Sequence, residues 1–293
     1  MKSDEKLKKP SWLKKRLASG EIYQKVYKLL KESHLHTVCQ EAHCPNLGDC
    51  FSEGTATFMI LGDRCTRNCT FCAIRHDYPL PLDASEPQEV SKAVKALRLK
   101  YAVITSVTRD DLPDGGACQF EKTIQAIRAE SPGTSIEVLI PDFQGAESAL
   151  ATVVASGPDV INHNLETVPR LYAEVRPQAV YERSLQLIER VGKMDGRILT
   201  KSGLMLGLGE SREEIMGVLK DLLEAGCRAL TLGQYLSPSP DHHPVVRFLH
   251  PEEFSSLKSA AQEMGFAAVA SGPFVRSSFH AGEIFFKMHT TSE

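Results

Sequence analysis

The feature that most constrains the fold is a regular alternation of short apolar runs and longer amphipathic segments after residue 55. The short runs are rich in β-branched residues and indicate buried parallel strands, at residues 57–62, 101–107, 135–140, 159–164, 199–207 and 228–235. The amphipathic segments have helical periodicity, at residues 86–99, 119–130, 144–156, 180–193, 211–225 and 251–264. This order predicts right-handed βαβ units in an α/β fold with a parallel sheet, either an open doubly wound sheet or a full or partial barrel.

Composition limits the possible functions. With 293 residues, of which 42% are hydrophobic, the chain is long enough to bury a large core. Its formal net charge of -3 gives no overall positive field, so we expect no nucleic-acid partner. Residues 1–31 are rich in lysine, which favours a solvated basic arm or, alternatively, a contact surface for an acidic protein. No long apolar run follows these lysines, so we expect no secretion signal, no membrane span and a cytoplasmic location.

Polar and glycine-rich loops follow several of the predicted strands. They are CTRNCTFC (65–72), TRDDLPDGG (108–116), NHNLETV (162–168) and GLGE (207–210). Parallel α/β folds gather functional groups at the carboxyl ends of their strands, so we expect these loops to form the site. Ser211 followed by Glu214 is typical of a capping box and predicts the start of the helix expected at 211–225.

Six of the eight cysteines lie in two groups of three: Cys39, Cys44 and Cys50 in CQEAHCPNLGDC, and Cys65, Cys69 and Cys72 in CTRNCTFC. Thiols stay reduced in the cytoplasm, where clustered cysteines are more often metal ligands or catalytic groups than disulfides. A four-iron cluster held by three thiolates keeps one iron open, as reactive sites do, whereas structural zinc takes four ligands. A zinc site that recruits His76 is the alternative. Cys118 and Cys227 stand alone and are expected to be packing residues.

The spacing CxxxCxxC directly after the first predicted strand, with Phe71 before the last cysteine, resembles the radical S-adenosylmethionine (SAM) superfamily. This resemblance implies a partial (β/α)6 TIM-type barrel. It also implies a 4Fe–4S cluster at Cys65, Cys69 and Cys72, whose open iron binds SAM and whose electron cleaves it to a 5′-deoxyadenosyl radical. In such enzymes the cofactor supplies the difficult chemistry and the protein supplies binding and the exclusion of water.

The second group of cysteines and most of the remaining chain resemble the lipoyl synthase family. Besides the two cysteine spacings, the matching motifs are PLPLD (79–83), TSVTRDDLPDGGA (105–117), PDFQG (141–145), NHNLETVPRLY (162–172), TKSGLMLGLGE (200–210), LTLGQYL (230–236) and SGPFVRSSFHAGE (271–283). They occur in order from about residue 36 to residue 283. Three positions depart from the commoner family pattern, since the chain has Asp49, Phe51 and Phe279 where Glu, Trp and Tyr are more usual.

The resemblance implies a second, auxiliary 4Fe–4S cluster at Cys39, Cys44 and Cys50, with Ser278 of the RSSF motif as its fourth ligand and Arg276 balancing charge. The auxiliary cluster is implied to be the sulfur donor. Two sulfur atoms are implied to enter at C6 and C8 of an octanoyl chain, which is linked to a lysine of a carrier domain. The implied carriers are the glycine cleavage H protein and acyltransferase subunits of 2-oxoacid dehydrogenases, and flavodoxin or ferredoxin is the implied electron donor.

The remaining loops are implied to contact SAM. The candidate residues are Phe71, Gly115, Gly116, Asn162, Asn164 and Glu166. On its own a DGG sequence indicates only a turn, and the polar residues are also those that cap the end of a strand. The resemblance divides the chain into an amino-terminal extension (1–54), a radical SAM core (55–265) and a carboxyl-terminal extension (266–293). The alternatives are another radical SAM sulfur-inserting enzyme with an auxiliary cluster, and a non-catalytic iron–sulfur or zinc-binding protein.

Overall fold

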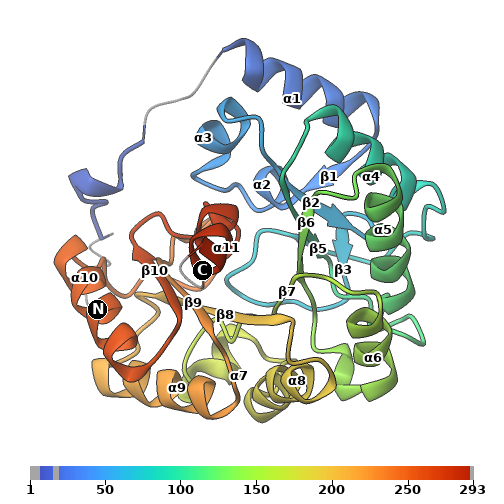
Figure 1. Cartoon of the computed structure of the whole chain (residues 1–293). Coiled ribbons are helices and arrows are strands. Elements are labelled where there is room, and N and C mark those ends of the chain that lie inside the picture. The colour runs from blue at the N-terminus through green and yellow to red at the C-terminus, as the bar shows by residue number, and fades with distance from the viewer. Residues whose placement is uncertain (1–6, 16–19, 291–293) are drawn as a thin grey trace.

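The computed structural model describes residues 7–15 and 20–290, and its centre is a large sheet that curves into a partial barrel (Figure 1). The parallel strands, in spatial order, are β2 (Thr57–Ile60), β5 (Tyr101–Ser106), β6 (Ser135–Leu139), β7 (Val160–Asn162), β8 (Leu199–Leu206), β9 (Ala229–Gln234) and β10 (Ala268–Gly272). A short strand, β1 (His36–Thr37), pairs antiparallel with β2. All six predicted strands are confirmed, and β10 adds a parallel strand that the sequence analysis did not predict.

The predicted helices are also confirmed, and they cover the outer face of the sheet (Figure 1). They are α4 (Glu86–Ala96), α5 (Ala117–Glu130), α6 (Glu147–Ala155), α8 (Tyr181–Met194), α9 (Arg212–Glu224) and α10 (Pro251–Met264). The capping box at the start of α9 is present, because Ser211 accepts a hydrogen bond from the Glu214 amide and the Glu214 side chain accepts one from the Ser211 amide. Outward-facing apolar side chains of the strands pack on these helices and form the core.

Shorter elements decorate this core. The helices are α1 (Glu21–Glu32), α2 (Val38–Glu41), α3 (Leu47–Ser52), α7 (Tyr172–Val175) and α11 (Ala281–Thr290). The 3-10 turns are η1 (Ser11–Leu13), η2 (Phe143–Gly145) and η3 (Pro169–Leu171), and β3 (Arg64–Cys65) pairs with β4 (Arg75–His76). Val26 and Leu30 of α1 and Phe51 of α3 are buried in one cluster with Phe58 of β2, which fixes the amino-terminal helices to one edge of the sheet.

The carboxyl-terminal helix α11 lies at the opposite end of the barrel from the candidate loops. Its Phe285 packs against Tyr101, with ring centroids 5.3 Å apart, and shares a buried cluster with Val160 and Leu199 near the starts of their strands. Because β10 ends at the other end of the barrel, residues 273–280 must pass from the carboxyl ends of the strands toward their amino ends (Figure 1).

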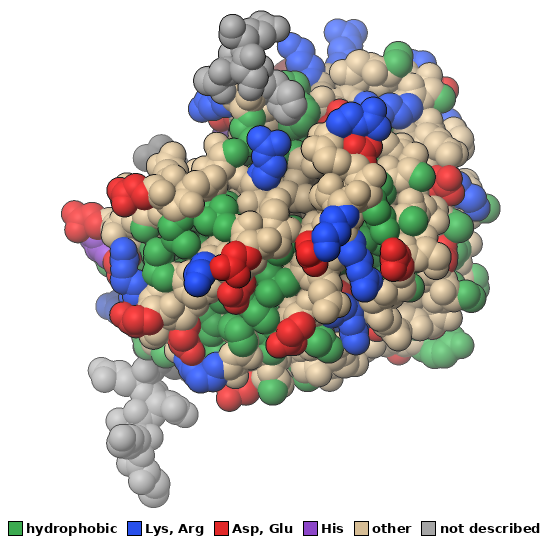
Figure 2. Space-filling view, turned by 60° about the horizontal axis from the view of Figure 1, so that its bottom comes forward, with side chains coloured by type: hydrophobic (Ala, Val, Ile, Leu, Met, Phe, Trp, Pro, Cys, Tyr) green, Lys and Arg blue, Asp and Glu red, His purple; other side chains and the backbone are tan. Residues whose placement is uncertain are grey.

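The surface shows no separation of charge on the face in Figure 2, where lysine and arginine side chains alternate with aspartate and glutamate. This distribution agrees with the small net charge of -3. In the part of the chain that the structure describes, no helix has the length and apolar character needed to cross a membrane.

Candidate functional site

The first group of cysteines lies in the loop after β2. The backbone amides of Arg67 and Thr108 donate to Cys65 Sγ at 3.5 and 3.3 Å. Burial, with further contributions from neighbouring thiols, raises the pKa of Cys69 and raises that of Cys72 to about 12. Three thiols therefore converge in a partly desolvated space and receive amide donors, an arrangement that suits thiolates whose charge is neutralised by an iron–sulfur cluster.

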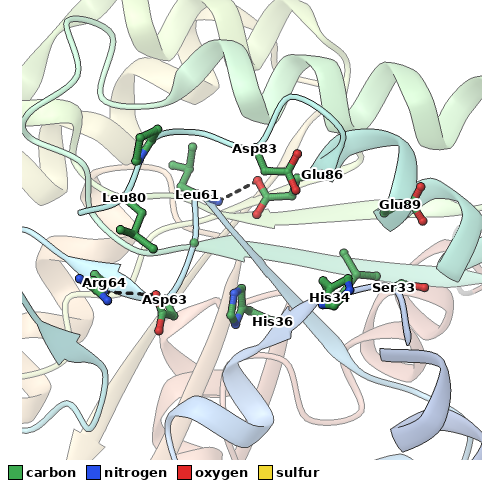
Figure 3. A pocket seen from close by; sticks show the side chains of 13 residues that line it. Ser33, His34, His36, Leu61, Asp63, Arg64, Leu80, Asp83, Glu86 and Glu89 are labelled. Carbon is green, nitrogen blue, oxygen red and sulfur yellow. Dashed lines mark hydrogen bonds and ion pairs between the residues drawn. The ribbon is translucent and has the colours of Figure 1, made fainter. Parts of the chain in front are cut away.

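A strained turn directs the chain from β2 into this loop. Leu61 has a φ of 71° and Gly62 one of 87°, values that a leucine rarely adopts. The buried Glu86 at the start of α4 accepts the Leu61 amide at 2.9 Å, and Arg109 Nη1 donates to the Leu61 carbonyl at 3.3 Å. Figure 3 shows Leu61 and Glu86, joined by this hydrogen bond, on one side of a pocket and His36 on the other. The volume of this pocket is about 160 Å³. Backbone strain held in place from both sides is common where a loop carries function.

Arg67, which lies between the cysteines of the first group, was not singled out by the sequence analysis. Its guanidinium is buried and donates to Asp110 at 2.6 and 2.9 Å and to Asp142 at 2.5 Å. Arg183 also pairs with Asp142, at 3.2 Å. Although burial alone would raise the pKa of Asp142, the bonds and charge from Arg67 hold it at about 2. Arg67 thus ties the cysteine loop to the loops after β5 and β6.

The second group of cysteines converges in the same way. Cys39 lies in α2, Cys50 lies in α3, and Cys44 lies between the two helices. Burial raises the pKa of Cys39 to about 11 and that of Cys50 to about 12, and the neighbouring thiols of the group add to both shifts. No disulfide links them, and all three cysteines are free. Among the described residues, no three His, Cys, Asp or Glu side chains are arranged to hold a single metal ion.

The carboxyl-terminal RSSF motif lies beside the second group of cysteines. Asn46, between Cys44 and Cys50, donates to the Phe274 carbonyl at 2.7 Å. Lys15 donates to Asn46 Oδ1 at 2.5 Å, forms an ion pair with Asp49, and lies 4.6 Å from the ring centroid of Phe274 and 5.2 Å from that of Phe279. Two of the positions that depart from the family pattern, Asp49 and Phe279, therefore meet at one lysine. This cation was expected to belong to a solvated arm, and that expectation is wrong for Lys15.

The two serines of RSSF have different surroundings. Ser277 Oγ accepts a hydrogen bond from Asn164 Nδ2 at 2.6 Å, and the Ser277 carbonyl accepts one from Lys201 Nζ at 2.6 Å. Within residues 7–15 and 20–290, no side-chain hydrogen bond of Ser278 is found. The hydroxyl of Ser278 is thus the one that remains free for another role.

Glu166 connects the two groups of cysteines. Desolvation raises the pKa of Glu166, while Arg176, Asn164 and Arg276 oppose that shift. Its carboxylate in turn acts on the pKa of Cys69 in the first group, and Arg276 interacts electrostatically with both Cys44 and Glu166. Asn164 Nδ2 donates to both Glu166 and Ser277, so Glu166 lies near the RSSF motif as well as within electrostatic reach of Cys69.

Asn164 and Arg176 lie beside Glu166. Asn164 Nδ2 donates to Glu166 Oε1 at 3.0 Å, whereas its Oδ1 is buried without a partner among the described residues. Arg176, which the sequence analysis missed, donates to the carbonyls of Asn164 and Leu165, each at 2.9 Å. An unpaired buried acceptor is costly, so Asn164 Oδ1 fits a site that receives a polar ligand.

The other predicted SAM contacts have contacts within the protein that account for them in part. Asn162 Nδ2 donates to Glu137 inside the barrel at 3.1 Å, while its Oδ1, like that of Asn164, is buried without a partner among the described residues. Gly115 and Gly116 both have positive φ. A Cβ added to Gly115 would lie 2.9 Å from Phe143 Cδ1, and one added to Gly116 would lie 2.3 Å from Leu61 Cδ1. Close packing thus accounts for both glycines. Phe71 packs against the core cluster on the side of β8 and β9. For these residues, contact with SAM stays a prediction.

The two isolated cysteines differ from each other. Cys227 is buried in the core, as predicted. Cys118 is exposed on α5, so its assignment as a packing residue is wrong. Burial was predicted because free cysteine is among the most often buried residue types.

His163, in the loop after β7, gives a prediction about pH. Its Nδ1 bonds to the Ile140 carbonyl at 2.8 Å and its Nε2 to Ser184 Oγ at 3.0 Å, and burial lowers its pKa to about 4. In the unfolded chain this histidine takes up a proton at a higher pH than in the folded protein. The stability that neutral His163 contributes is therefore fully present above the unfolded pKa of about 6.5 and is lost as the pH falls toward 4. We expect the contribution of His163 to the free energy of unfolding of the metal-free protein to fall by about 2 kcal/mol between pH 7 and pH 5.

Urea unfolding at the two pH values measures this change, with His163→Gln as the comparison. The variant is less stable at both pH values, but it should lose most of the difference between them. The depressed pKa of Asp142 does not interfere, because its contribution is lost only below pH 4, as the pH falls toward 2. An equal pH dependence in both proteins would contradict the assignment to His163.

Comparison with known proteins first defines the class. Residues 59–222 match the family model described as "Radical SAM superfamily". Methylornithine synthase has a similar fold, with a TM-score of 0.53 and 13% identity over 80% of this chain and 81% of that one. SuiB of Streptococcus suis, solved with SAM bound, gives a TM-score of 0.59 and 10% identity over 77% and 54% of the two chains. The predicted partial TIM-type barrel is confirmed, and the superfamily implies a 4Fe–4S cluster and SAM as cofactors.

Relatives with much higher sequence identity define the family within this superfamily. Lipoyl synthase of Caldicellulosiruptor saccharolyticus is 55% identical over 276 residues, which cover 94% of this chain and 97% of the relative. Lipoyl synthase of Methylococcus capsulatus is 54% identical over 94% and 86% of the two chains. Residues 1–44 match the model for the N-terminal domain of lipoyl synthase of the radical SAM family. The chain belongs to the lipoyl synthase family and is therefore an enzyme, a sulfurtransferase, which excludes the electron-carrier and zinc-module alternatives.

Proposed function

We propose that this enzyme holds two 4Fe–4S clusters, one at each group of cysteines, and uses them to insert sulfur at C6 and C8 of an octanoyl chain on a carrier lysine. The observation that carries the proposal is the position of Asn164, whose Nδ2 donates to Glu166, which acts electrostatically on Cys69, and to Ser277, next to Ser278. A substrate carbon near Asn164 would lie between the two groups. A single-cluster enzyme has no need for a second group of three thiols.

The cysteines differ in their proposed roles. Cys65, Cys69 and Cys72 would hold the cluster that binds SAM, and Cys39, Cys44 and Cys50 would hold the auxiliary cluster. When bound, these groups supply the one-electron cleavage of SAM and the sulfur that is transferred. The chain itself holds the first loop in place through Arg67 and offers the unpaired Asn164 Oδ1 as a polar contact for SAM.

Ser278 is the proposed fourth ligand of the auxiliary cluster. The free hydroxyl of Ser278 supports this choice over Ser277, whose oxygen atoms are used by Asn164 and Lys201. A serine oxygen is a harder donor than a thiolate and easier to displace from iron, which suits a cluster that gives up its sulfur. Arg276 lies close enough to Cys44 to interact with its charge and would balance the oxygen when it is released.

The partners follow from the reaction. The substrate is an octanoylated carrier domain, and we propose the glycine cleavage H protein and the acyltransferase subunits of 2-oxoacid dehydrogenases as carriers. Flavodoxin or ferredoxin would supply electrons in the cytoplasm. The lysine-rich residues 1–31 remain a proposed contact for an acidic carrier, apart from Lys15, which is already paired with Asp49.

The test is anaerobic reconstitution of the wild-type protein, followed by addition of SAM, a strong reductant and an octanoyl-lysine peptide. We expect about eight irons per chain with matching sulfide, and a peptide that gains two sulfur atoms. The peptide mass and the amount of 5′-deoxyadenosine are followed together. Deoxyadenosine without sulfur on the peptide would point to another substrate, and about four irons would show that one group of cysteines holds no cluster.

A further inference from the structure

Residues 275–277, which lead into the free hydroxyl of Ser278, are held from inside the barrel by two neighbouring strands and one loop. Lys201 of β8 donates to the Ser277 carbonyl, Asn164 after β7 donates to the Ser277 hydroxyl, and Gly233 of β9 lies against the Val275 carbonyl. These contacts fix both the side chain and the backbone of residue 277. We call this set of contacts the serine seat.

Gly233 makes room for the seat. A Cβ built at this position would lie 2.1 Å from the Val275 carbonyl oxygen and 3.2 Å from Arg276 Nη1. The first of these atoms belongs to the backbone and cannot rotate away. Because the φ of Gly233 is not positive, the position needs glycine for space and not for its conformation. Any side chain at residue 233 would therefore displace residues 275 and 276.

Lys201 is fixed in turn by Glu137 of β6. Lys201 Nζ donates to Glu137 Oε1 and Oε2 at 2.8 and 3.0 Å, and the two side chains are only 3% and 1% exposed. Glu137 also accepts bonds from the Tyr101 hydroxyl at 2.7 Å and from Asn162 at 3.1 Å. With the Ser277 carbonyl, the three donors of the ammonium group are all used. A buried ion pair adds little stability over an apolar pair, so its value here is to fix a position.

We propose that Gly233, Lys201 and Glu137 are positioning residues that select the fourth ligand: they hold Ser277 to the barrel wall so that Ser278 is presented to Cys39, Cys44 and Cys50. The proposal rests on the proposed function in one respect, the assignment of a serine as ligand. The seat also explains why two adjacent serines are not equivalent. The hydroxyl of Ser277 is bonded to Asn164, whereas the neighbouring Phe279 ring lies over Lys15, next to the loop that carries the cysteines.

The first test uses the metal-free, full-length protein and does not depend on any cluster. Amide hydrogen exchange of residues 274–281 is compared in wild type, Gly233→Ala and the matched control Gly217→Ala, which lies in α9 with no atom within 4 Å of an added Cβ. We expect about tenfold faster exchange in Gly233→Ala only. Unchanged exchange in Gly233→Ala would show that the contacts of the serine seat do not hold residues 274–281 in place.

A second variant tests the same contacts without adding a side chain next to Val275. The double variant Lys201→Met/Glu137→Gln removes the hydrogen bond to the Ser277 carbonyl and both buried charges together. Faster exchange of residues 274–281 is again expected, whereas exchange in α9 should stay as in wild type. If this variant kept the full protection of residues 274–281, Lys201 would have no role in holding the segment.

The last test asks which serine binds iron. In a chain with Cys65, Cys69 and Cys72 all changed to alanine, the iron reports only on the second group of cysteines. Removal of iron by a chelator should be about tenfold faster in Ser278→Ala than in Ser277→Ala, and Gly233→Ala should abolish that difference. A difference that survives Gly233→Ala would overturn the positioning role. No difference between the serine variants in either background would instead overturn the serine ligand, even if the exchange results support the seat.

Discussion

Replacing Cys44 by alanine is expected to stop sulfur transfer to the octanoyl peptide while 5′-deoxyadenosine continues to form. Cys44 lies between α2 and α3 and interacts with Cys39, Cys50 and Arg276, all on the side of the RSSF motif. The first group of cysteines has its own loop after β2, held by Arg67 and by the Leu61 turn, and neither depends on Cys44. We expect sulfur transfer to fall by at least about a hundredfold, because even residues that only support a metal ligand cost up to that factor.

Two further cysteine variants provide controls for this result. Cys69→Ala, in the first group, should stop both the formation of deoxyadenosine and the transfer of sulfur. Cys118→Ala changes an exposed cysteine outside both groups and should leave both products at wild-type amounts. Liquid chromatography with mass detection measures both products in one sample. Sulfur on the peptide in the Cys44→Ala reaction would contradict the proposal that the second group of cysteines holds the sulfur donor.

Replacing Lys201 by methionine is expected to destabilise the folded protein strongly. The substitution leaves the Glu137 carboxylate buried without its cation, and breaking a buried pair in this way costs about 3–5 kcal/mol. Adding Glu137→Gln removes the unpaired charge and should restore most of the loss. Urea unfolding of the metal-free wild type, single variant and double variant at pH 7 measures the three free energies.

The matched control for Lys201→Met is Lys220→Met on α9. Lys220 pairs with Glu224 one helical turn away, at 3.7 Å, but both side chains are largely exposed. Such a pair contributes only about 0.5 kcal/mol or less, since water screens the charges. A Lys201→Met protein that is as stable as Lys220→Met would show that Glu137 is protonated or hydrated when its partner is absent.

The strands, the main helices and both groups of cysteines could be predicted from the sequence because their signals are local. A buried strand is an apolar run, a helix has a period of 3.6, and cysteine spacing is visible in a few residues. Strand β10 was missed because its sequence, AVASG, is short and made mainly of small residues. Its place in the sheet comes from pairing with β9, a tertiary contact that propensity does not contain.

The charged residues of the site could not be predicted in the same way. Arg67 finds its partners Asp110 and Asp142 at sequence separations of 43 and 75 residues. Arg176 and Lys15 likewise have no local pattern that separates them from a solvated arginine or lysine. The choice between Ser277 and Ser278 depends on Asn164, which is 113 residues away from Ser277. Only the folded barrel brings these groups together.

The contact between Asn46 and the Phe274 carbonyl joins positions 228 residues apart. During translation, the second group of cysteines is made before any of the parallel strands, whereas the serine that would complete it follows all of them. A growing chain can therefore pair its first strands long before this site is whole. Loading of iron into the second group with all four proposed ligands therefore has to wait until residue 278 has been made.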